Sequence, residues 1–400
     1  MEKLLILLIA CFFLAACAPQ IEKPITWKHL TSANGDIEAP NAGNQQTATA
    51  LFDINKDGLN DFIITERSQA PAVVMYLRTP SGWDRYVIEA EALRIEAGSA
   101  VADIDGDGDL DVVFGGDGGS NQVWWWENPY PNYDPNAPWK RRLIKNGGAN
   151  KHHDQMFGDF NGDGREELVF WNQNARTLFH AEIPNDVKNV DVWELTPIYI
   201  YGNESEPPQR GSYPGWKGVN EHEGLAKCDV DGDGVLDIVG AGRWFKYIEG
   251  TTFEVHVIDD TYAFSRSAVG DFIKGGRPEV FLVVGDGRAP LVLYERQGDK
   301  WVDKIIIDEV QDGHSIDVLD FNGDGHLDLF LAEMRLGDYP NPMTRILLGD
   351  GKGNFDVKVI HTGFGLHESR IADLDGDGDY DILGKPYTWM APRLDIWLQE

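Results

Sequence analysis

Short apolar stretches of strand length recur along the chain, separated by polar turns rich in Asp, Asn and Gly. One stretch leads into an acidic run, as in TATALFD and HSIDVLD, and another leads out of it, as in DFIITE and DLFLAE. A third follows, such as VVMYLR, and a fourth begins at an aromatic residue, as in WDRYVIE and WVDKIII. Because β-branched and aromatic residues bounded by turn residues favour strands, the pattern predicts units of four antiparallel strands.

The acidic run marks each unit of this repeat. Six runs follow the pattern D-x-[DN]-x-D-G-x-x-[DE], and a seventh, DFIKGGRPE, keeps the spacing without the acidic third and fifth positions. The seven runs begin at Asp53, Asp103, Asp159, Asp229, Asp271, Asp320 and Asp373. Seven units of four strands at such a period predict an all-β fold, a seven-bladed β-propeller with four-stranded antiparallel blades.

The two ends of the chain agree with this number of blades. Residues 393–400, RLDIWLQE, form a third strand with no fourth strand after it. Residues 27–31, WKHLT, form a fourth strand with no third strand before it. We therefore expect one blade to be closed by the N- and C-terminal strands together.

The first residues predict an export signal rather than part of the fold. Residues 1–16 carry an apolar run that is too short to span a bilayer permanently. The sequence LAAC that ends at Cys17 resembles a bacterial lipobox, which implies acylation of Cys17 and a tether over residues 17–24. The propeller then covers residues 25–400, and we expect a lipid-anchored protein of the outer membrane that faces the periplasm or the cell surface. A plain secretory signal is the alternative.

The six complete acidic runs each collect oxygen ligands within nine residues. Positions 1, 3, 5 and 9 supply side-chain oxygens, and the glycine at position 6 permits a tight turn. They are not EF-hands, because no run has the bidentate Glu at position 12. The predicted ligands are Asp53, Asn55, Asp57, Asp61, Asp103, Asp105, Asp107, Asp111, Asp159, Asn161, Asp163, Glu167, Asp229, Asp231, Asp233, Asp237, Asp320, Asn322, Asp324, Asp328, Asp373, Asp375, Asp377 and Asp381.

These runs resemble the calcium loops of FG-GAP/VCBS repeats, a family of seven-bladed propellers. The resemblance implies about six structural Ca²⁺ ions, which hold hairpins and take no part in chemistry. Such ions would offset a large part of the formal net charge of −31, whereas solvated turns without metal are the alternative. The charge argues against nucleic acid as a partner.

A second set of polar residues lies at the other end of the first strand of each unit. His153, His314 and His367 each precede the first Asp of their run by six residues. Glu223 holds that position in the fourth unit, and His222 and His152 are direct neighbours of this set. Six strand residues cover roughly 20 Å, so these side chains should meet near the axis on the opposite face. One such histidine alone would suggest a strand end bonded to the backbone, but the repetition indicates a site for Zn²⁺ or another divalent ion, or for a general base.

Other segments that reach this face carry matching chemistry. They supply Arg243, Arg266, Glu333, Arg335, Lys385, Tyr387, Gln173 and Asp286, and the long loop before the fourth unit supplies Trp216. Aromatic side chains with scattered arginines on an acidic protein suggest a carbohydrate ligand, one that bears a carboxylate or sulfate.

Familiar catalytic motifs of other classes are absent from the sequence, including the G-x-S-x-G elbow, the P-loop and a dinucleotide fingerprint. The order HHDQ, HEGLA, HS and HES is similar to the propeller domain of aldos-2-ulose dehydratase. This resemblance implies β-elimination of water from keto-sugars or uronic-acid-terminated oligosaccharides during polysaccharide breakdown. The cupin domains of that family have no counterpart here.

The resemblance and the chemistry suggest roles for individual residues. His153 and His367 are the candidate acid and base, and Tyr387 a candidate proton donor to the departing oxygen. His222, Glu223, His314 and His152 are candidate metal ligands or orienting groups, and His314 is a candidate catalytic residue as well. Arg266 or Arg335 would hold the substrate carboxylate, while Arg243, Trp216, Lys385 and Glu333 would bind the sugar.

Three other functions fit the same residues. A polysaccharide lyase would use the same proton abstraction to expel an alcohol. A non-catalytic glycan-binding propeller needs aromatic side chains and arginines but not four inward groups. A hydrolase needs a carboxylate pair, which Glu223 with Glu333 or Asp154 could supply.

Overall fold

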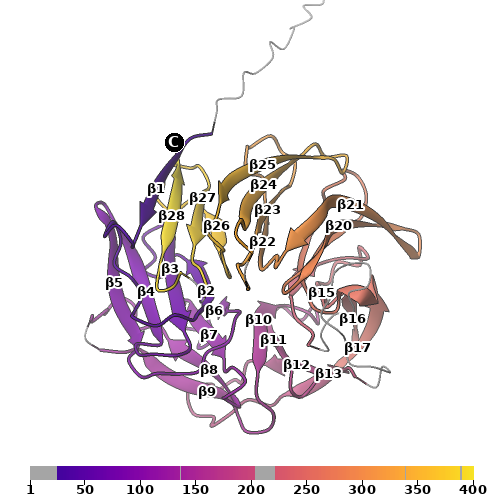
Figure 1. Ribbon diagram of the computed structural model, residues 1–400. Coiled ribbons are helices and arrows are strands. Elements are labelled where there is room, and N and C mark those ends of the chain that lie inside the picture. The colour runs from indigo at the N-terminus through magenta and orange to yellow at the C-terminus, as the bar shows by residue number, and fades with distance from the viewer. Residues whose placement is uncertain (1–24, 136, 203–220, 338, 388–389) are drawn as a thin grey trace, which may run out of the picture.

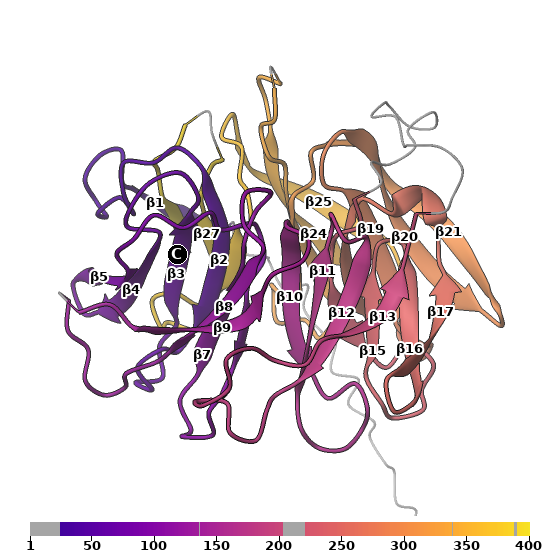
Figure 2. The same ribbon diagram turned by 90° about the horizontal axis from the view of Figure 1, so that it is seen from below.

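The computed structural model describes residues 25–135, 137–202, 221–337, 339–387 and 390–400. Seven four-stranded antiparallel sheets form a closed ring around a central axis, as Figure 1 shows. Seen from the side, the strands run between the two faces of a disc (Figure 2). The predicted seven-bladed β-propeller is therefore confirmed. Within the described residues, no helix could span a membrane.

In six of the seven blades the strands run outward from the axis in sequence order. The first three blades consist of β2 Gln46–Phe52, β3 Asp61–Glu66, β4 Val73–Thr79 and β5 Gly82–Glu89; β6 Ala100–Ala102, β7 Asp111–Gly115, β8 Gln122–Glu127 and β9 Lys140–Asn146; and β10 His152–Gly158, β11 Glu167–Asn172, β12 Thr177–Glu182 and β13 Thr196–Ile200.

The next three blades follow the same plan, and a single 3₁₀ turn, η1 Asp260–Tyr262, precedes the fifth. They consist of β14 Ala226–Cys228, β15 Asp237–Gly240, β16 Arg243–Glu249 and β17 Thr252–Val257; β18 Ser265–Gly270, β19 Glu279–Val284, β20 Arg288–Gln297 and β21 Lys300–Gln311; and β22 Ser315–Leu319, β23 Asp328–Ala332, β24 Met343–Gly349 and β25 Phe355–Thr362.

The seventh blade joins the two ends of the chain, as the sequence predicts. Its strands are β26 Arg370–Ala372, β27 Asp381–Gly384, β28 Asp395–Gln399 and, outermost, β1 Trp27–Thr31. β1 pairs antiparallel with β28 from Trp27 opposite Gln399 to Thr31 opposite Asp395. In Figure 1 the mark for the C-terminus lies beside β1. This pairing closes the ring with backbone hydrogen bonds.

The hydrophobic core is divided among the spaces between neighbouring blades. The third strand of the second blade illustrates how alternation fills two of these spaces at once. Trp124 and Trp126 pack toward the first blade, and Trp125 packs toward the third, because successive strand residues point to opposite faces of the sheet. All three indoles are almost fully buried. Strands buried on both faces explain why the sequence shows apolar runs rather than strict alternation.

Each acidic run forms the turn between the first and second strands of its blade. Its ninth residue is a buried carboxylate that accepts a hydrogen bond from the backbone N–H of the second residue, at 2.7 to 3.1 Å. These donor–acceptor pairs are Ile54–Asp61, Ile104–Asp111, Phe160–Glu167, Val230–Asp237, Phe272–Glu279, Phe321–Asp328 and Leu374–Asp381. The ninth position thus closes the turn in every blade, including the one whose run lacks the other acidic residues.

The turn of the fifth blade is held by its neighbour as well. Glu279 accepts from the N–H groups of both Phe272 and Ile273, each at 2.9 Å. Ile273 also forms a β-bridge with Lys352 in the sixth blade, and the N–H of Lys274 donates to the carbonyl of Gly351. Backbone pairing between blades therefore accompanies the loss of the acidic third and fifth positions.

Candidate active site

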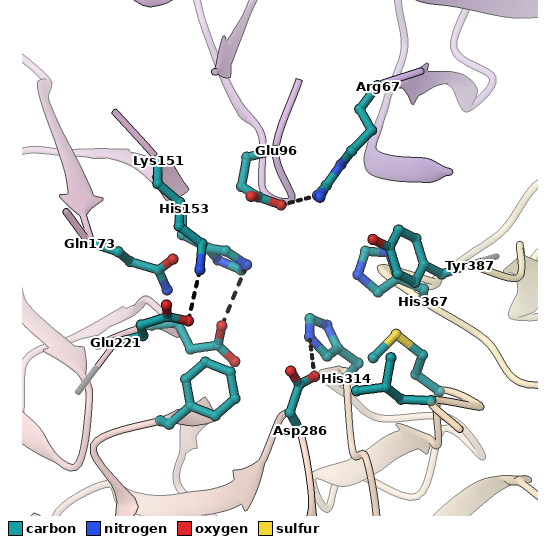
Figure 3. Close-up of a pocket in the computed structure, with 14 residues that line it drawn as sticks. Arg67, Glu96, Lys151, His153, Gln173, Glu221, Asp286, His314, His367 and Tyr387 are labelled. Atoms are coloured by element: carbon teal, nitrogen blue, oxygen red, sulfur yellow. Dashed lines mark hydrogen bonds and ion pairs between the residues drawn. The ribbon is translucent and has the colours of Figure 1, made fainter. Parts of the chain in front are cut away.

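The ends of the inner strands opposite the acidic turns surround a cavity of about 260 Å³ on the axis. Figure 3 shows His153, His314 and His367 reaching toward it from different sides. Its lining consists of Arg67, Glu96, Lys151, His153, Gln173, Glu221, Glu223, Phe264, Asp286, His314, Met334, Leu336, His367 and Tyr387. Five predicted site residues, His153, Glu223, His314, His367 and Tyr387, are thus brought together.

A distortion of β10 places two functional groups at the axis instead of one. The pairing of β10 with β11 shifts register between His153 and Gln155, and Asp154 has a φ of 46°. A non-glycine residue in this region is strained, and such strain is often found at functional sites. The bend brings Oδ2 of Asp154 within 2.8 Å of Nδ1 of His153. Asp154 therefore fixes the ring of the neighbouring histidine, whose Nε2 faces the cavity.

Glu223 faces His153 from the fourth blade. Nε2 of His153 lies 3.4 Å from Oε2 of Glu223, and both side chains are buried. The backbone N–H of Gly224 donates to Asp154 at 2.8 Å, which ties the two blades together beneath this pair. Oε1 of Glu223 is buried and has no hydrogen-bond partner among the described residues. An unpartnered carboxylate oxygen of this kind is a candidate base or hydrogen-bond acceptor for a ligand.

Arg266, in the fifth blade, contacts residues of three other blades near the cavity. Its guanidinium contacts Oδ1 of Asp154 at 2.5 Å, Oε1 of Glu368 at 2.6 Å and Nδ1 of His314 at 2.8 Å. Glu368 also pairs with Arg370, which in turn contacts Asp317 at 3.2 Å. Arg266 is not part of the cavity lining, so it is placed to orient the lining groups rather than to touch a ligand.

The surroundings raise the pKa values of both His153 and Glu223 above their ordinary values. Burial lowers the pKa of His153, but the charges of Asp154 and Glu223 outweigh it and raise the pKa to about 9. Burial raises the pKa of Glu223 to about 7, although Arg266 and His153 oppose the rise. At neutral pH the cavity therefore holds a protonated imidazole beside a carboxyl group that can gain or lose a proton.

His314 and His367 differ from His153 in charge. Burial, followed by the positive charges of Arg266 and His153, holds the pKa of His314 well below its ordinary value. Burial, together with His314 and Lys385, does the same to the pKa of His367. The two rings lie 4.5 Å apart between centroids, and His367 stacks on Tyr387 at 4.9 Å. Both histidines are therefore neutral groups in the same cavity as a charged one.

Two ion pairs flank the cavity, and their residues were not among the predicted site residues. Arg67 contacts Glu96 and lies over the ring of Tyr387, while Nζ of Lys151 contacts Oε2 of Glu221 at 2.7 Å (Figure 3). Arg67 directly follows β3, as Gln173 directly follows β11, so the end of the second strand of the first blade is the sequence signal that could have identified it. Glu96 and Glu221 lie in loops before inner strands, where no spacing in the sequence marks them.

His152 and His222 are buried but do not line the cavity. His152 points to the other face of β10, where its ring lies near Phe170 and its Nδ1 lies 2.9 Å from the carbonyl oxygen of Gly116. His222 stacks on Tyr201 with ring centroids 3.6 Å apart. Strand alternation turns His152 away from the axis, whereas His222 lies in the loop before β14.

Four more predicted residues lie outside the cavity lining. Arg335 lies after the end of β23 between two lining residues, Met334 and Leu336, but does not itself line the cavity. Glu333 accepts from two backbone N–H groups and pairs with Arg345. The side chain of Arg243 donates to the carbonyl of Ala241.

Lys385 lies directly behind His367. Its Nζ contacts the carbonyl oxygens of Thr47 and His367 at 2.9 and 2.7 Å and lies 3.5 Å from Nδ1 of His367. These contacts assign it a supporting position rather than a place in the cavity. Trp216 and Cys17, together with residues 1–16 and the tether, lie outside the described residues.

The acidic turns fit calcium. Four of them bring three carboxylates within 4.8 Å of one another, namely Asp103, Asp105 and Asp107; Asp159, Asp163 and Glu167; Asp229, Asp231 and Asp237; and Asp373, Asp375 and Asp381. Burial is the first cause that raises the pKa of the ninth-position carboxyls, to about 8 for Asp111 and about 7 for Asp381. A cation among these oxygens would counter that rise.

The cavity fits a preformed zinc site less well. In the described part of the chain, no group of three metal-binding side chains with such close ligand atoms includes an axial histidine. A guanidinium can only donate, so Nδ1 of His314 accepts from Arg266 and the proton of the neutral ring must lie on Nε2. Zinc-bound histidines instead donate from the second ring nitrogen to an acceptor. Acid–base chemistry agrees with this arrangement better than ligation does.

Comparison with known proteins supports the repeat. Residues 53–114, 103–170 and 271–331 match the FG-GAP-like repeat family, so the protein is a seven-bladed β-propeller that contains FG-GAP repeats. The last match includes the degenerate acidic run that begins at Asp271. No curated protein matches the chain significantly.

Solved structures share the architecture at low identity. The NanB sialidase from Streptococcus pneumoniae is 11% identical, with a TM-score of 0.43 over 91% of this chain and 69% of the sialidase chain. A protein from Lactobacillus plantarum is 10% identical, with a TM-score of 0.50 over 85% of this chain and 89% of its own. At such identity the likeness to the Lactobacillus plantarum protein shows the fold alone.

Proposed function

We propose that the protein is a carbohydrate dehydratase that eliminates water from a sugar bound in the axial cavity. The observation that carries the proposal is the pair formed by His153 and Glu223, an acid and a base 3.4 Å apart in a buried cavity. Groups whose pKa values are pushed toward and past neutrality by burial and neighbours are typical of general acid–base sites.

The pair can perform the elimination and return to its starting state. Ionised Glu223 takes the proton from the carbon next to a carbonyl or carboxylate group, and the electron pair of that C–H bond moves into the adjacent C–C bond. The C–O bond at the β-carbon breaks, and protonated His153 gives its proton to the departing hydroxyl, which leaves as water. The proton on Glu223 then passes to neutral His153 across their 3.4 Å contact.

The remaining lining agrees with a single sugar unit as ligand. The cavity, at about 260 Å³, is smaller than the roughly 300–1,000 Å³ of pockets for drug-sized ligands. Phe264, Met334 and Leu336 supply an apolar wall, and Tyr387 an aromatic ring. A space of this size on the axis supports action on a free sugar or a chain end over cleavage within a long polysaccharide.

The proposal extends to the acidic turns and to Cys17. About six Ca²⁺ ions would occupy the acidic turns, and a lipid on Cys17 would hold the protein at the outer membrane, where oligosaccharides with uronic-acid ends or keto-sugars are met during polysaccharide breakdown. A zinc or other divalent ion at the axis is not needed for the steps above.

The proposal is tested by incubating the calcium-loaded protein with keto-sugars and with uronic-acid oligosaccharides. Absorbance of an unsaturated sugar acid or enone should rise, and mass spectrometry should show products that have lost one water. Cleavage into two fragments whose masses add up to the mass of the intact chain would instead indicate a lyase. Saturable binding without any change in mass would indicate a glycan-binding propeller and contradict the dehydratase.

A further inference from the structure

His314 makes a hydrogen bond that fixes the position of its proton. Its Nδ1 lies 2.8 Å from Nη2 of Arg266, and a guanidinium has donors but no acceptor. The ring nitrogen must therefore accept. Glu368, the acceptor that could compete for a proton on Nδ1, lies 4.0 Å away, which is too long for a hydrogen bond. A neutral His314 consequently carries its only proton on Nε2.

The surroundings keep His314 neutral. The ring is buried, and burial with the charges of Arg266 and His153 holds its pKa well below the ordinary value, although Asp154 acts in the opposite direction. Lys385 also lowers it. The neutral ring of His367 lies 4.5 Å from the ring of His314, and Asp286 lies 3.6 Å from its Nε2. The positive charges of His153 and Arg266 thus oppose protonation of His314.

We infer that His314 is a catalytic residue that acts as a fixed, neutral hydrogen-bond donor to the carbonyl oxygen of the substrate, with Arg266 as its positioning residue. The inference rests on the proposed function. His314 lines the same cavity as His153 and Glu223, and its ring centroid lies 6.3 Å from that of His153. Figure 3 shows the two histidines reaching into the cavity from different sides. When a base removes the proton next to a carbonyl group, negative charge develops on the carbonyl oxygen, and a preoriented donor stabilises it.

This role differs from the ligand role that the sequence suggested for His314. A donor fixed by Arg266 stabilises the developing enolate without a metal ion, and it does not exchange protons with the substrate. The division of work then follows from the charges: Glu223 accepts a proton, His153 gives one, and His314 keeps its own.

The inference is tested by ¹⁵N NMR of the full-length, calcium-loaded protein labelled at its histidines, with the His314 signals assigned from their absence in His314→Gln. We expect a protonated Nε2 and an unprotonated, hydrogen-bonded Nδ1 at neutral pH. An imidazolium, or a proton on Nδ1, overturns the inference. No substrate is needed for this measurement, so it is decided independently of the activity.

Kinetics test the catalytic part. His314→Ala should lower kcat by about 10²- to 10³-fold, the usual loss when one donor to a developing oxyanion is removed, and His314→Gln, which keeps a donor, should recover part of it. Equal turnover by His314→Ala and the unaltered enzyme overturns the inference alone. If the NMR signals are as expected but the protein dehydrates no sugar, the proposed function and this catalytic role are overturned. The assignment of the proton to Nε2 of His314 is then still supported.

Discussion

The two ends of one inner strand use polar side chains in opposite ways. At the acidic end of β10, Glu167 accepts a hydrogen bond from Phe160, seven residues earlier in the same turn. At the axial end, Asp154 contacts Arg266, which is 112 residues away and belongs to another blade. The first contact recurs in all seven blades, and the second occurs once. A repeated local contact stabilises the fold, whereas a single long-range contact builds a site.

The difference also appears in what each end leaves unsatisfied. The acidic turns place carboxylates of one sign close together, and Lys188 at Asp105 and Lys246 at Asp231 counter only part of this charge. A divalent cation from solution would counter the rest. The axial cavity already balances Asp154 and Glu368 with Arg266, whereas Oε1 of Glu223 has no hydrogen bond among the described residues and only a 3.8 Å ion-pair contact with Arg266. The first arrangement suits an ion and the second suits a reacting ligand.

Removal of calcium should have the largest effect and should act at the acidic end. At a free ion concentration of 100 times Kd, each site stabilises the folded state by about 2.7 kcal/mol. Loss of several ions should therefore lower Tm by at least about 10 °C, as measured by calorimetry before and after exhaustive chelation. An unchanged melting curve would contradict the assignment of calcium to the acidic turns.

The pH dependence of kcat/KM sharpens the comparison at the axial end. Glu223 must be ionised and His153 protonated, so activity should rise as pH passes about 7 and fall as it passes about 9. Asp154→Asn removes a charge that raises the pKa of His153, so the alkaline limb should move to lower pH. A profile that falls steadily between pH 6 and pH 8 would contradict the assigned roles.

A substitution with a smaller effect distinguishes the hydrogen-bonding role of the ninth-position carboxylate from metal binding. Glu279→Ala removes the carboxyl group that accepts two backbone hydrogen bonds in the blade without an acidic third or fifth position. Two backbone N–H groups then lose their acceptor, which should cost about 1–3 kcal/mol in the free energy of unfolding, equally with and without calcium. Asp375→Ala is the matched control, because its effect should vanish after chelation. If chelation also abolished the effect of Glu279→Ala, the structural role of this position would be lost.

The fold could be predicted from the sequence almost completely because its determinants are local and repeated. The acidic runs mark every turn between first and second strands, and the half-blades at residues 27–31 and 393–400 reveal how the ring closes. The structural role of the ninth carboxylate could not be predicted, since the sequence pattern of a metal ligand and of a buried hydrogen-bond acceptor is the same.

The site could be predicted only where the repeat itself carries it. The spacing of six residues before each acidic run found His153, Glu223, His314 and His367, because equivalent residues of different blades meet at the axis. It did not mark Asp154, because the register shift after His153 that brings this carboxylate to the histidine ring leaves no sign in the repeat. Glu96 and Glu221 come from loops of irregular length, whose course the repeat does not specify.

The central claim is that chemistry belongs to the axial end, and the adjacent histidines of β10 test it most directly. The measurement is the rate of water loss from the sugar substrate, by mass spectrometry, for calcium-loaded His153→Ala and His152→Ala at equal concentrations of folded protein. We predict a loss of about 10²- to 10⁴-fold for His153→Ala, with its calcium-dependent rise in Tm intact, and near-normal turnover for the less stable His152→Ala. Full activity in His153→Ala would contradict the account.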